Sequence, residues 1–175
     1  VIGATALAVR GLPRMTRYLD LTVHAEDQVR ALKAFQGAGL RMAVPLGDPE
    51  DPDPMVVLVD AATAVEVDLL AAAGDPEATV IREAVPAQVF GTRAPVATLE
   101  HLLLLYLYSN QPRHIGDFAS IVQSGKADLA HAEQKLRDMH PEMLPDFRRR
   151  VKQALHPPPA PPRPASRNRA GRPRS

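Results

Sequence analysis

The 175-residue sequence contains no cysteine and no tryptophan. The lack of cysteine excludes disulfide bonds and thiolate metal sites, and it is in keeping with a reducing, cytoplasmic location. No apolar run reaches the roughly 18 residues that a membrane-spanning helix needs. The longest such run lies at residues 102–107, and no secretory signal is visible. We therefore expect a cytoplasmic protein that does not enter a membrane.

Proline is plentiful but concentrated at one end. Seven of the 18 prolines lie in residues 157–175, together with five arginines and no acidic residue. Such a segment cannot bury apolar area, which predicts a disordered basic tail. Because this tail holds five of the 21 Lys and Arg residues and none of the 20 Asp and Glu residues, the rest of the chain has four more acidic than basic side chains. The tail arginines offer sequence-independent contacts to nucleic acid, but no aromatic residues lie among them for base stacking.

The remaining length suits one domain with a hydrophobic core. We predict an α/β fold in which a short mixed sheet flanked by helices, at residues 1–96, is followed by a helical part of the same domain at residues 97–156. Residue 1 is a valine inside an apolar segment, so we expect the natural start of the chain to lie upstream.

Apolar periodicity places the individual elements. A strand end at residues 1–2 is expected to pass through Gly3 into a short helix that ends near Gly11. Alternating or β-rich runs predict strands at residues 19–23, 55–59, 65–70 and 88–90. Helical spacing predicts helices at residues 26–35, 76–84, 99–108, 115–123, 128–139 and 145–155.

Local signals add detail to these elements. The runs at 55–59 and 65–70 are expected to form a hairpin, and the proline-rich, acidic segment 48–54 an exposed turn. Asp75 and Thr98 are expected to cap the helices that follow them. In the helix at 26–35, spacing predicts one buried face, made of Val29, Leu32 and Phe35.

Residues 1–23 carry the clearest chemical pattern. A glycine between a strand and the start of a helix lets backbone N–H groups approach a phosphate, and Gly3 has this position. A second strand then brings acidic side chains to the same edge, where they hold Mg²⁺ against the phosphate. Asp20 lies on that predicted strand. Carboxylates on alternate strand residues point the same way, so an Asp-x-Asp pattern forms a metal site.

This segment resembles the nucleotidyltransferase superfamily, with its DNA polymerase β-like fold, and most closely the AbiE-type toxin branch. The family pattern is an apolar residue, Gly, and then Gly or Ser, followed after a short helix by Asp-x-Asp. Ile2 and Gly3 match, whereas Ala4 replaces the second Gly or Ser. The spacing puts Tyr18 and Asp20 at the two metal-binding positions, and only Asp20 is acidic. Further family-like residues are Ala6, Leu7, Ala8, Gly11, Arg14 and Thr16.

The resemblance extends less specifically to about residue 155. It implies a third carboxylate on a later strand, for which we choose Asp68 because an Asp-Leu-Leu ending is typical of the branch; Glu66, on the same face, is the alternative. It also implies a helix pair that carries a lysine and two aspartates. Tyr106 stands in the place of the lysine and His114 in that of one aspartate, while Asp117 remains.

The resemblance implies Mg²⁺-dependent transfer of a nucleoside monophosphate from an NTP to an RNA or protein acceptor, as in a toxin paired with an antitoxin. Asp20 and Asp68 would be catalytic and hold the metal with Glu66, and the nucleotide would contact the residues Gly3, Ala4, Arg14 and Thr16. Tyr18 is neutral at pH 7 and a poor Mg²⁺ ligand, so we expect weak or absent transfer. No other acidic residue lies between Gly3 and Asp20, so no shift of the alignment restores the pair; a mutant or engineered Tyr18 is the other explanation.

Two alternatives stay open: a catalytically inactive module that binds nucleotide or RNA, and a partner protein of a toxin–antitoxin system. Several residues also have a purely structural interpretation. We expect Tyr106 and Tyr108 to pack in or beside the core, His114 to be a surface residue at a helix cap, and Asp117 to be an ordinary acid near a helix N-terminus. The six histidines lack zinc-site spacing.

Overall fold

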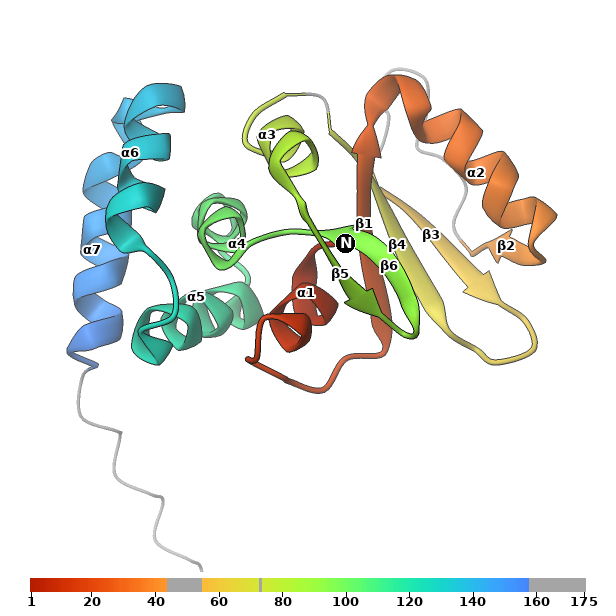
Figure 1. The fold of residues 1–175 in the computed structure, drawn as a ribbon, viewed down its shortest axis with the longest axis horizontal. Coiled ribbons are helices and arrows are strands. Elements are labelled where there is room, and N and C mark those ends of the chain that lie inside the picture. The colour runs from red at the N-terminus through yellow and green to blue at the C-terminus, as the bar shows by residue number, and fades with distance from the viewer. Residues whose placement is uncertain (44–54, 73, 158–175) are drawn as a thin grey trace, which may run out of the picture.

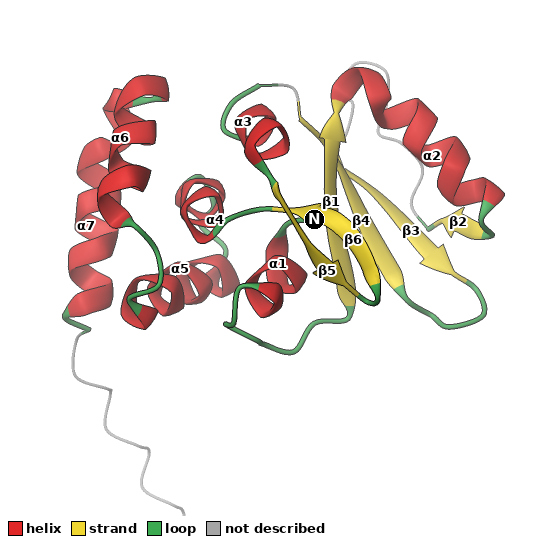
Figure 2. Ribbon diagram, in the orientation of Figure 1, coloured by secondary structure: helices red, strands yellow, loops and turns green. Residues whose placement is uncertain are grey.

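The computed structural model describes residues 1–43, 55–72 and 74–157. The predicted turn at 48–54 and the tail beyond residue 157 lie outside these residues. Helices and a small mixed sheet form an α/β fold, as predicted, with a helical C-terminal part (Figures 1 and 2). The elements up to the second hairpin are α1 (Gly3–Val9), β1 (Tyr18–His24), η1 (Ala25–Asp27), α2 (Gln28–Gly37), β2 (Leu40–Met42), β3 (Met55–Asp60), β4 (Glu66–Ala72), α3 (Glu77–Glu83), β5 (Val85–Val89) and β6 (Thr92–Val96). The helical part comprises α4 (Leu99–Leu107), α5 (Pro112–Ser124), α6 (Leu129–Met139), η2 (Pro141–Met143) and α7 (Leu144–Leu155).

The main sheet has the strand order β1-β4-β3-β2. β1 and β4 are parallel, whereas β3 runs antiparallel to both of its neighbours. The predicted hairpin between residues 55–59 and 65–70 is confirmed as the β3–β4 pair. In the parallel pair, Asp20 is aligned with Asp68, and Tyr18 with Glu66.

Alternation along β1 and β4 decides which side chains share a face of the sheet. The odd-numbered apolar residues of both strands pack with Leu32 of α2 in one core cluster: Leu19, Leu21, Val23, Val67 and Leu69. The even-numbered residues therefore occupy the opposite face, where Leu70 packs against the larger core cluster. Helices α1 and α4 lie on this side of the sheet, and α2 lies on the other side (Figure 1). Asp20 and Asp68 belong to this second face.

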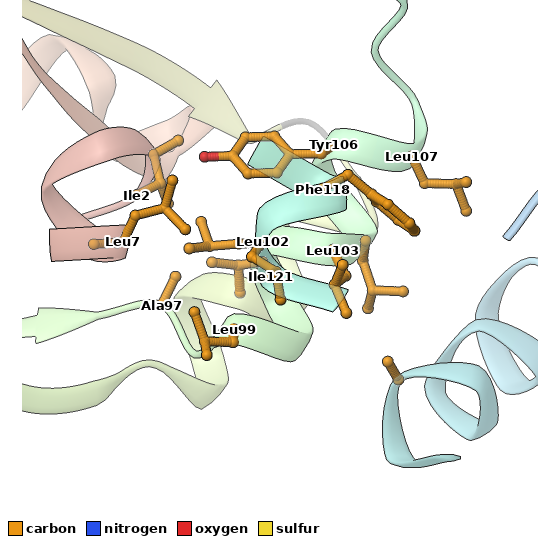
Figure 3. Close-up of a cluster of buried hydrophobic side chains, with 14 of the residues drawn as sticks. Ile2, Leu7, Ala97, Leu99, Leu102, Leu103, Tyr106, Leu107, Phe118 and Ile121 are labelled. Carbon is orange, nitrogen blue, oxygen red and sulfur yellow. The ribbon is translucent and has the colours of Figure 1, made fainter. Parts of the chain in front are cut away.

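The larger core cluster joins α1 and β6 to helices α4–α7 (Figure 3). At its centre lies α4, in which seven of nine residues are buried. A helix surrounded on most sides must be apolar around most of its circumference, which explains the leucine-rich sequence. The predicted cap is confirmed, since the Thr98 hydroxyl accepts the His101 N–H at 3.3 Å.

Residues Val1 and Ile2 connect the main sheet to the second hairpin. The Ile2 N–H donates to the Asp20 carbonyl at 3.0 Å, and the Ala97 N–H donates to the Val1 carbonyl at 2.9 Å. This backbone pairing fixes the start of α1 against the middle of β1.

The second hairpin, β5–β6, departs from the sequence prediction. A short strand was expected at residues 88–90, but its partner β6 was missed because Pro86 and Pro95, which face each other in the hairpin, disfavour strands. Phe90 is not in a strand. It forms the connecting turn with Gly91, and the positive φ angles of 48° and 80° at these residues are those of a type I′ turn.

Two further predictions were wrong. Val29 is 60% exposed rather than buried. Each step of three residues falls short of a full helical turn, so Val29 is displaced around the axis from Phe35. Asp75 does not cap the backbone of α3; its carboxylate instead accepts the Thr79 hydroxyl at 2.6 Å, and α3 begins later, at Glu77.

Candidate functional site

A cavity of about 290 Å³ opens between the second face of the sheet and helices α1, α4 and α5. Five of the residues predicted for the site line it: Gly3, Arg14, Thr16, Asp20 and Asp68. The other two predicted residues have different positions. Ala4 is fully buried and takes part only through its backbone, and Glu66 is not part of the lining.

Gly3 allows α1 and β1 to approach each other closely. Its φ angle of +61° is readily adopted only by glycine, and an added Cβ would lie 2.5 Å from Cγ of Asp20 and clash with its Oδ2. The Ala4 N–H donates to the Asp20 carboxylate. The strand acid therefore sits directly against the first turn of α1, as the spacing of Gly3 and Asp20 predicts.

Asp20 and Asp68 form a pair of adjacent carboxylates. They occupy the same level on neighbouring parallel strands, which lie about 4.8 Å apart in a sheet. Burial and then the charge of Asp68 raise the pKa of Asp20, against smaller opposing effects of the Ala4 N–H, Arg113 and Arg14. Burial and then the charge of Glu66 raise the pKa of Asp68, which Arg113 opposes. A cation or a hydrogen-bond donor between the two carboxylates would stabilise their charged forms.

Tyr18 occupies the position where the resemblance calls for another carboxylate. It is 37% exposed and lines the cavity two residues from Asp20, on the same face of β1. Glu66, opposite Tyr18 in the register, does not replace the missing ligand within the cavity. Over residues 1–43, 55–72 and 74–157, no three His, Asp or Glu side chains are grouped to hold a metal ion.

These residues suit a metal ion that arrives with its ligand better than one held by the protein alone. Mg²⁺ is often bound by one or two carboxylates together with phosphate oxygens and water. Asp20 and Asp68 could supply the two carboxylates, and a phosphorylated ligand would have to supply the rest.

Arg14 is positioned by an ion pair that the sequence did not reveal. Its Nε donates to the Asp117 carboxylate, 2.9 Å from Oδ1 and 3.0 Å from Oδ2. Asp117 is buried, with 6% exposure, so its interpretation as an ordinary acid near a helix N-terminus was wrong. The helix turns it inward, where burial requires a charged partner. Thr16, in contrast, bonds through its hydroxyl to the backbone of Tyr18 at 3.1 Å.

Arg113 is a cavity residue that the sequence analysis missed. It lines the cavity from the first turn of α5, and its charge lowers the pKa of both Asp20 and Asp68. Among the residues described, it forms neither an ion pair nor a hydrogen bond. Its only signal in the sequence is its place beside His114, and this does not tell which way the side chain faces.

Tyr106 and His114 form part of the cavity wall. Their rings stack with centroids 4.9 Å apart and planes at 24°. Tyr106 packs in the core, as expected, but it also lines the cavity. His114 is half-buried rather than a surface residue, and its Nδ1 lies 2.7 Å from Oγ of Ser109. Burial and then the nearby Arg113 lower the pKa of His114, which favours the neutral ring.

On the sheet side the cavity thus has two carboxylates that form no ion pair among the described residues. Nearer the helices it has the guanidinium groups of Arg14, which is paired with Asp117, and of Arg113. A ligand that suits both sides carries negative charge for the arginines and a metal ion or hydroxyl groups for the acids.

No helix in the described part of the chain is long and apolar enough to cross a membrane. Comparison of the sequence with protein-family models gives no match, and comparison with curated proteins gives none either.

Proposed function

We propose that this protein is a nucleotidyltransferase-like protein whose cavity binds a nucleoside triphosphate together with Mg²⁺. The observation that carries the proposal is the convergence of Gly3, Asp20 and Asp68 on one cavity, across two strands and the start of a helix. The resemblance of residues 1–23 to nucleotidyltransferases requires this arrangement. Asp68 was chosen from the sequence as the carboxylate that accompanies Asp20, and the register of β1 with β4 supports this choice.

The charges of the cavity support the same proposal. Asp20 and Asp68, whose pKa values are raised, would hold the metal ion, and Arg14 and Arg113 would contact the phosphates. When bound, Mg²⁺ would neutralise charge on the phosphates and orient them. The chain itself contributes position and electrostatics, which is the main source of catalysis in phosphoryl transfer.

In the proposed reaction, a hydroxyl oxygen of an RNA or protein acceptor attacks the α-phosphorus of the nucleotide. The bond from that phosphorus to the bridging oxygen of the β-phosphate breaks, and pyrophosphate leaves with the bonding electrons. In this proposal Asp68 would accept the proton of the acceptor hydroxyl. Because Tyr18 provides no negative charge beside Asp20, we expect this reaction to be slow.

A thermal-shift experiment on the full chain tests the proposal, with ATP, CTP, GTP and UTP in turn, each with Mg²⁺ and with EDTA. Ligand at 100 times Kd stabilises a protein by about 2.7 kcal/mol, which amounts to several degrees in Tm. We expect such a rise with Mg²⁺, a much smaller rise in EDTA, and no Mg²⁺ dependence in Asp68→Asn.

Asp138→Asn is the matched control, because Asp138 is an exposed acid on α6 that bonds only to Gln134 among the described residues. It should behave as the parent protein. If no nucleotide shifts Tm under either condition, the proposal is wrong, and the cavity is vestigial, as in a protein that acts only as a binding partner.

A metal-independent nucleotide-binding module is the second candidate, favoured by Tyr18 and by the incomplete ligand set. It predicts equal Tm shifts with Mg²⁺ and with EDTA. Transfer of labelled nucleotide from an NTP to RNA or protein in the presence of Mg²⁺ would exclude it.

A further inference from the structure

The Tyr106 hydroxyl is a buried polar group without a partner in the described part of the protein. Only 4% of the residue is exposed, and its oxygen forms no hydrogen bond. Its residue nevertheless lines the cavity, and in Figure 3 the hydroxyl points away from α4 toward α1. A buried hydroxyl left unpaired is costly, and such groups in native proteins call for an explanation.

The tyrosine ring is held in place. It stacks on His114, whose Nδ1 is bonded to Ser109. Its ring also packs with apolar residues of the larger core cluster, while the charges of Asp117, Arg14, Asp20 and Arg113 act on its hydroxyl. The hydroxyl therefore cannot swing out to water without breaking this packing, and it keeps its place in a residue of the cavity wall.

The chemistry of the hydroxyl defines what it can bind. Burial, and next the charge of Asp117, raise the pKa of Tyr106 well above its ordinary value of 10, so the phenol stays protonated at neutral pH. A neutral phenol offers one O–H donor, and its strongest hydrogen bonds are to anionic acceptors.

Arg113 supplies a charge on the same wall of the cavity. Other arginines have partners within the protein: for example, Arg10 donates to the Val96 carbonyl, and Arg148 pairs with Glu133. Arg113, by comparison, has no bonded partner in the residues described. Among the described residues, a donor without a hydrogen-bond partner and a cation without an ion-pair partner thus lie together on the wall formed by α4 and α5. The charge of Arg113 also acts on Asp20 and Asp68.

We infer that Tyr106 and Arg113 form an anion subsite for the phosphate groups of the ligand, in which the Tyr106 hydroxyl donates to a phosphate oxygen and Arg113 neutralises its charge. The inference rests on the proposed function for the identity of the whole ligand, but the subsite itself needs only a polyphosphate. This position would orient a nucleotide so that its outer phosphates contact Tyr106 and Arg113. The metal ion bound to the nucleotide would then contact Asp20 and Asp68.

Calorimetric titration of the full chain with inorganic tripolyphosphate in EDTA tests the subsite without nucleotide or metal. We expect binding that weakens about tenfold or more in Tyr106→Phe, because a hydrogen bond to a charged group is lost. Arg113→Gln should weaken binding by a similar factor and reduce its salt dependence. Tyr108→Phe is the matched control, since Tyr108 caps the C-terminal end of α4 but packs edge-on against His140, outside the cavity, and the variant should bind as the parent protein.

Thermal unfolding separates binding from structure. Tyr106→Phe removes a buried hydroxyl that has no hydrogen-bond partner among the described residues, so its Tm without ligand should be unchanged or higher while its affinity falls. If Tyr106→Phe binds tripolyphosphate as tightly as the parent, or the parent does not bind it, the inference is overturned.

The same titrations distinguish this inference from the proposed function. Tripolyphosphate binding that depends on Tyr106, without any preference for NTP over tripolyphosphate, supports the subsite and counts against nucleotide binding. Mg²⁺-dependent NTP binding that is insensitive to Tyr106→Phe supports the proposed function and overturns the subsite.

Discussion

Two acidic sites lie near opposite ends of α4, and they differ in their hydrogen bonding and in the direction of their pKa shifts. Near the start of α4, Glu83 accepts hydrogen bonds from Lys135 and, at 3.2 Å, from His101. The bond from Lys135 is the largest cause of the lowered pKa of Glu83. Near the end of α4, Asp20 and Asp68 face the cavity with raised pKa values, chiefly because of burial.

The difference shows how to tell an acid that serves the fold from acids that serve a ligand. Glu83, on α3, interacts with His101 of α4 and Lys135 of α6, so its charge is compensated within the protein and it connects the three helices. Asp20 and Asp68 lie side by side with their charges largely uncompensated, an arrangement that lowers the stability of the empty protein. Such arrangements cluster at functional sites.

Removing the satisfied acid should have the largest effect on stability. Glu83→Ala leaves Lys135 and the buried His101 without their shared acceptor, so we expect a loss of about 2 kcal/mol in the free energy of unfolding. Urea denaturation measures it. Glu133→Ala is the control, because Glu133 pairs with Arg137 and Arg148 at the surface and should contribute less than about 1 kcal/mol. Equal losses in the two variants would contradict the distinction between these acids.

Closing the space beside Asp20 should have the next largest effect. Gly3→Ala introduces a Cβ at a positive φ angle and into the Asp20 carboxylate. We expect a loss of about 1–2 kcal/mol in stability from the backbone alone, and loss of nucleotide binding because Asp20 must move. Gly37→Ala, at a helical glycine with no atom near the added Cβ, should leave binding unchanged and should not lower stability. Retained binding in Gly3→Ala would show that the close approach is unnecessary.

Adding a third acid to the cavity should sharpen the contrast. Tyr18→Asp places a carboxylate beside Asp20 on the same face of β1, so we expect Mg²⁺-dependent nucleotide affinity to rise about tenfold, or about 1.4 kcal/mol. The protein without metal should become less stable, since like charges are brought together. Calorimetry with and without Mg²⁺ measures both effects. A flat titration of this variant would argue against a metal site at Asp20.

Neutralising one cavity acid should have a small effect of opposite sign. The pKa of Asp68 is raised in the fold, so its charge destabilises the protein above that pKa, and the effect vanishes as the pH falls toward the ordinary value of 3.8. Asp68→Asn should therefore stabilise the protein at pH 7, by less than about 1 kcal/mol, with a gain that shrinks on acidification. Glu83 acts oppositely: its contribution is present above 4.5 and is lost as the pH falls through its lowered pKa. Unfolding curves from pH 7 to below the lowered pKa of Glu83 show whether the two slopes differ in sign.

The parts of the site that sequence could predict are those set by local backbone geometry. The period of a strand places Asp20 and Asp68 opposite the apolar residues, and a glycine before a helix marks the close approach at Gly3. Arg113 and Tyr106 could not be assigned in this way. Their roles depend on how α4 and α5 pack against the sheet, and helical periodicity does not specify that packing.

Asp117 shows the same limit. Its partner Arg14 is 103 residues away, and no local signal joins them. The β5–β6 hairpin was missed for a different reason, since paired prolines hide a strand from propensity arguments.

The bond between Asp20 and the Ala4 N–H gives the protein a built-in reporter of occupancy. A ligand or metal ion that draws the Asp20 carboxylate into the cavity withdraws the acceptor from that amide. The exchange of the Ala4 amide proton with solvent, and its chemical shift, should therefore change whenever Asp20 binds a ligand or metal ion. The amide signal of Gly37, on the far side of the sheet, should not change. One amide resonance would then follow the state of the cavity without a label, a substrate or a turnover.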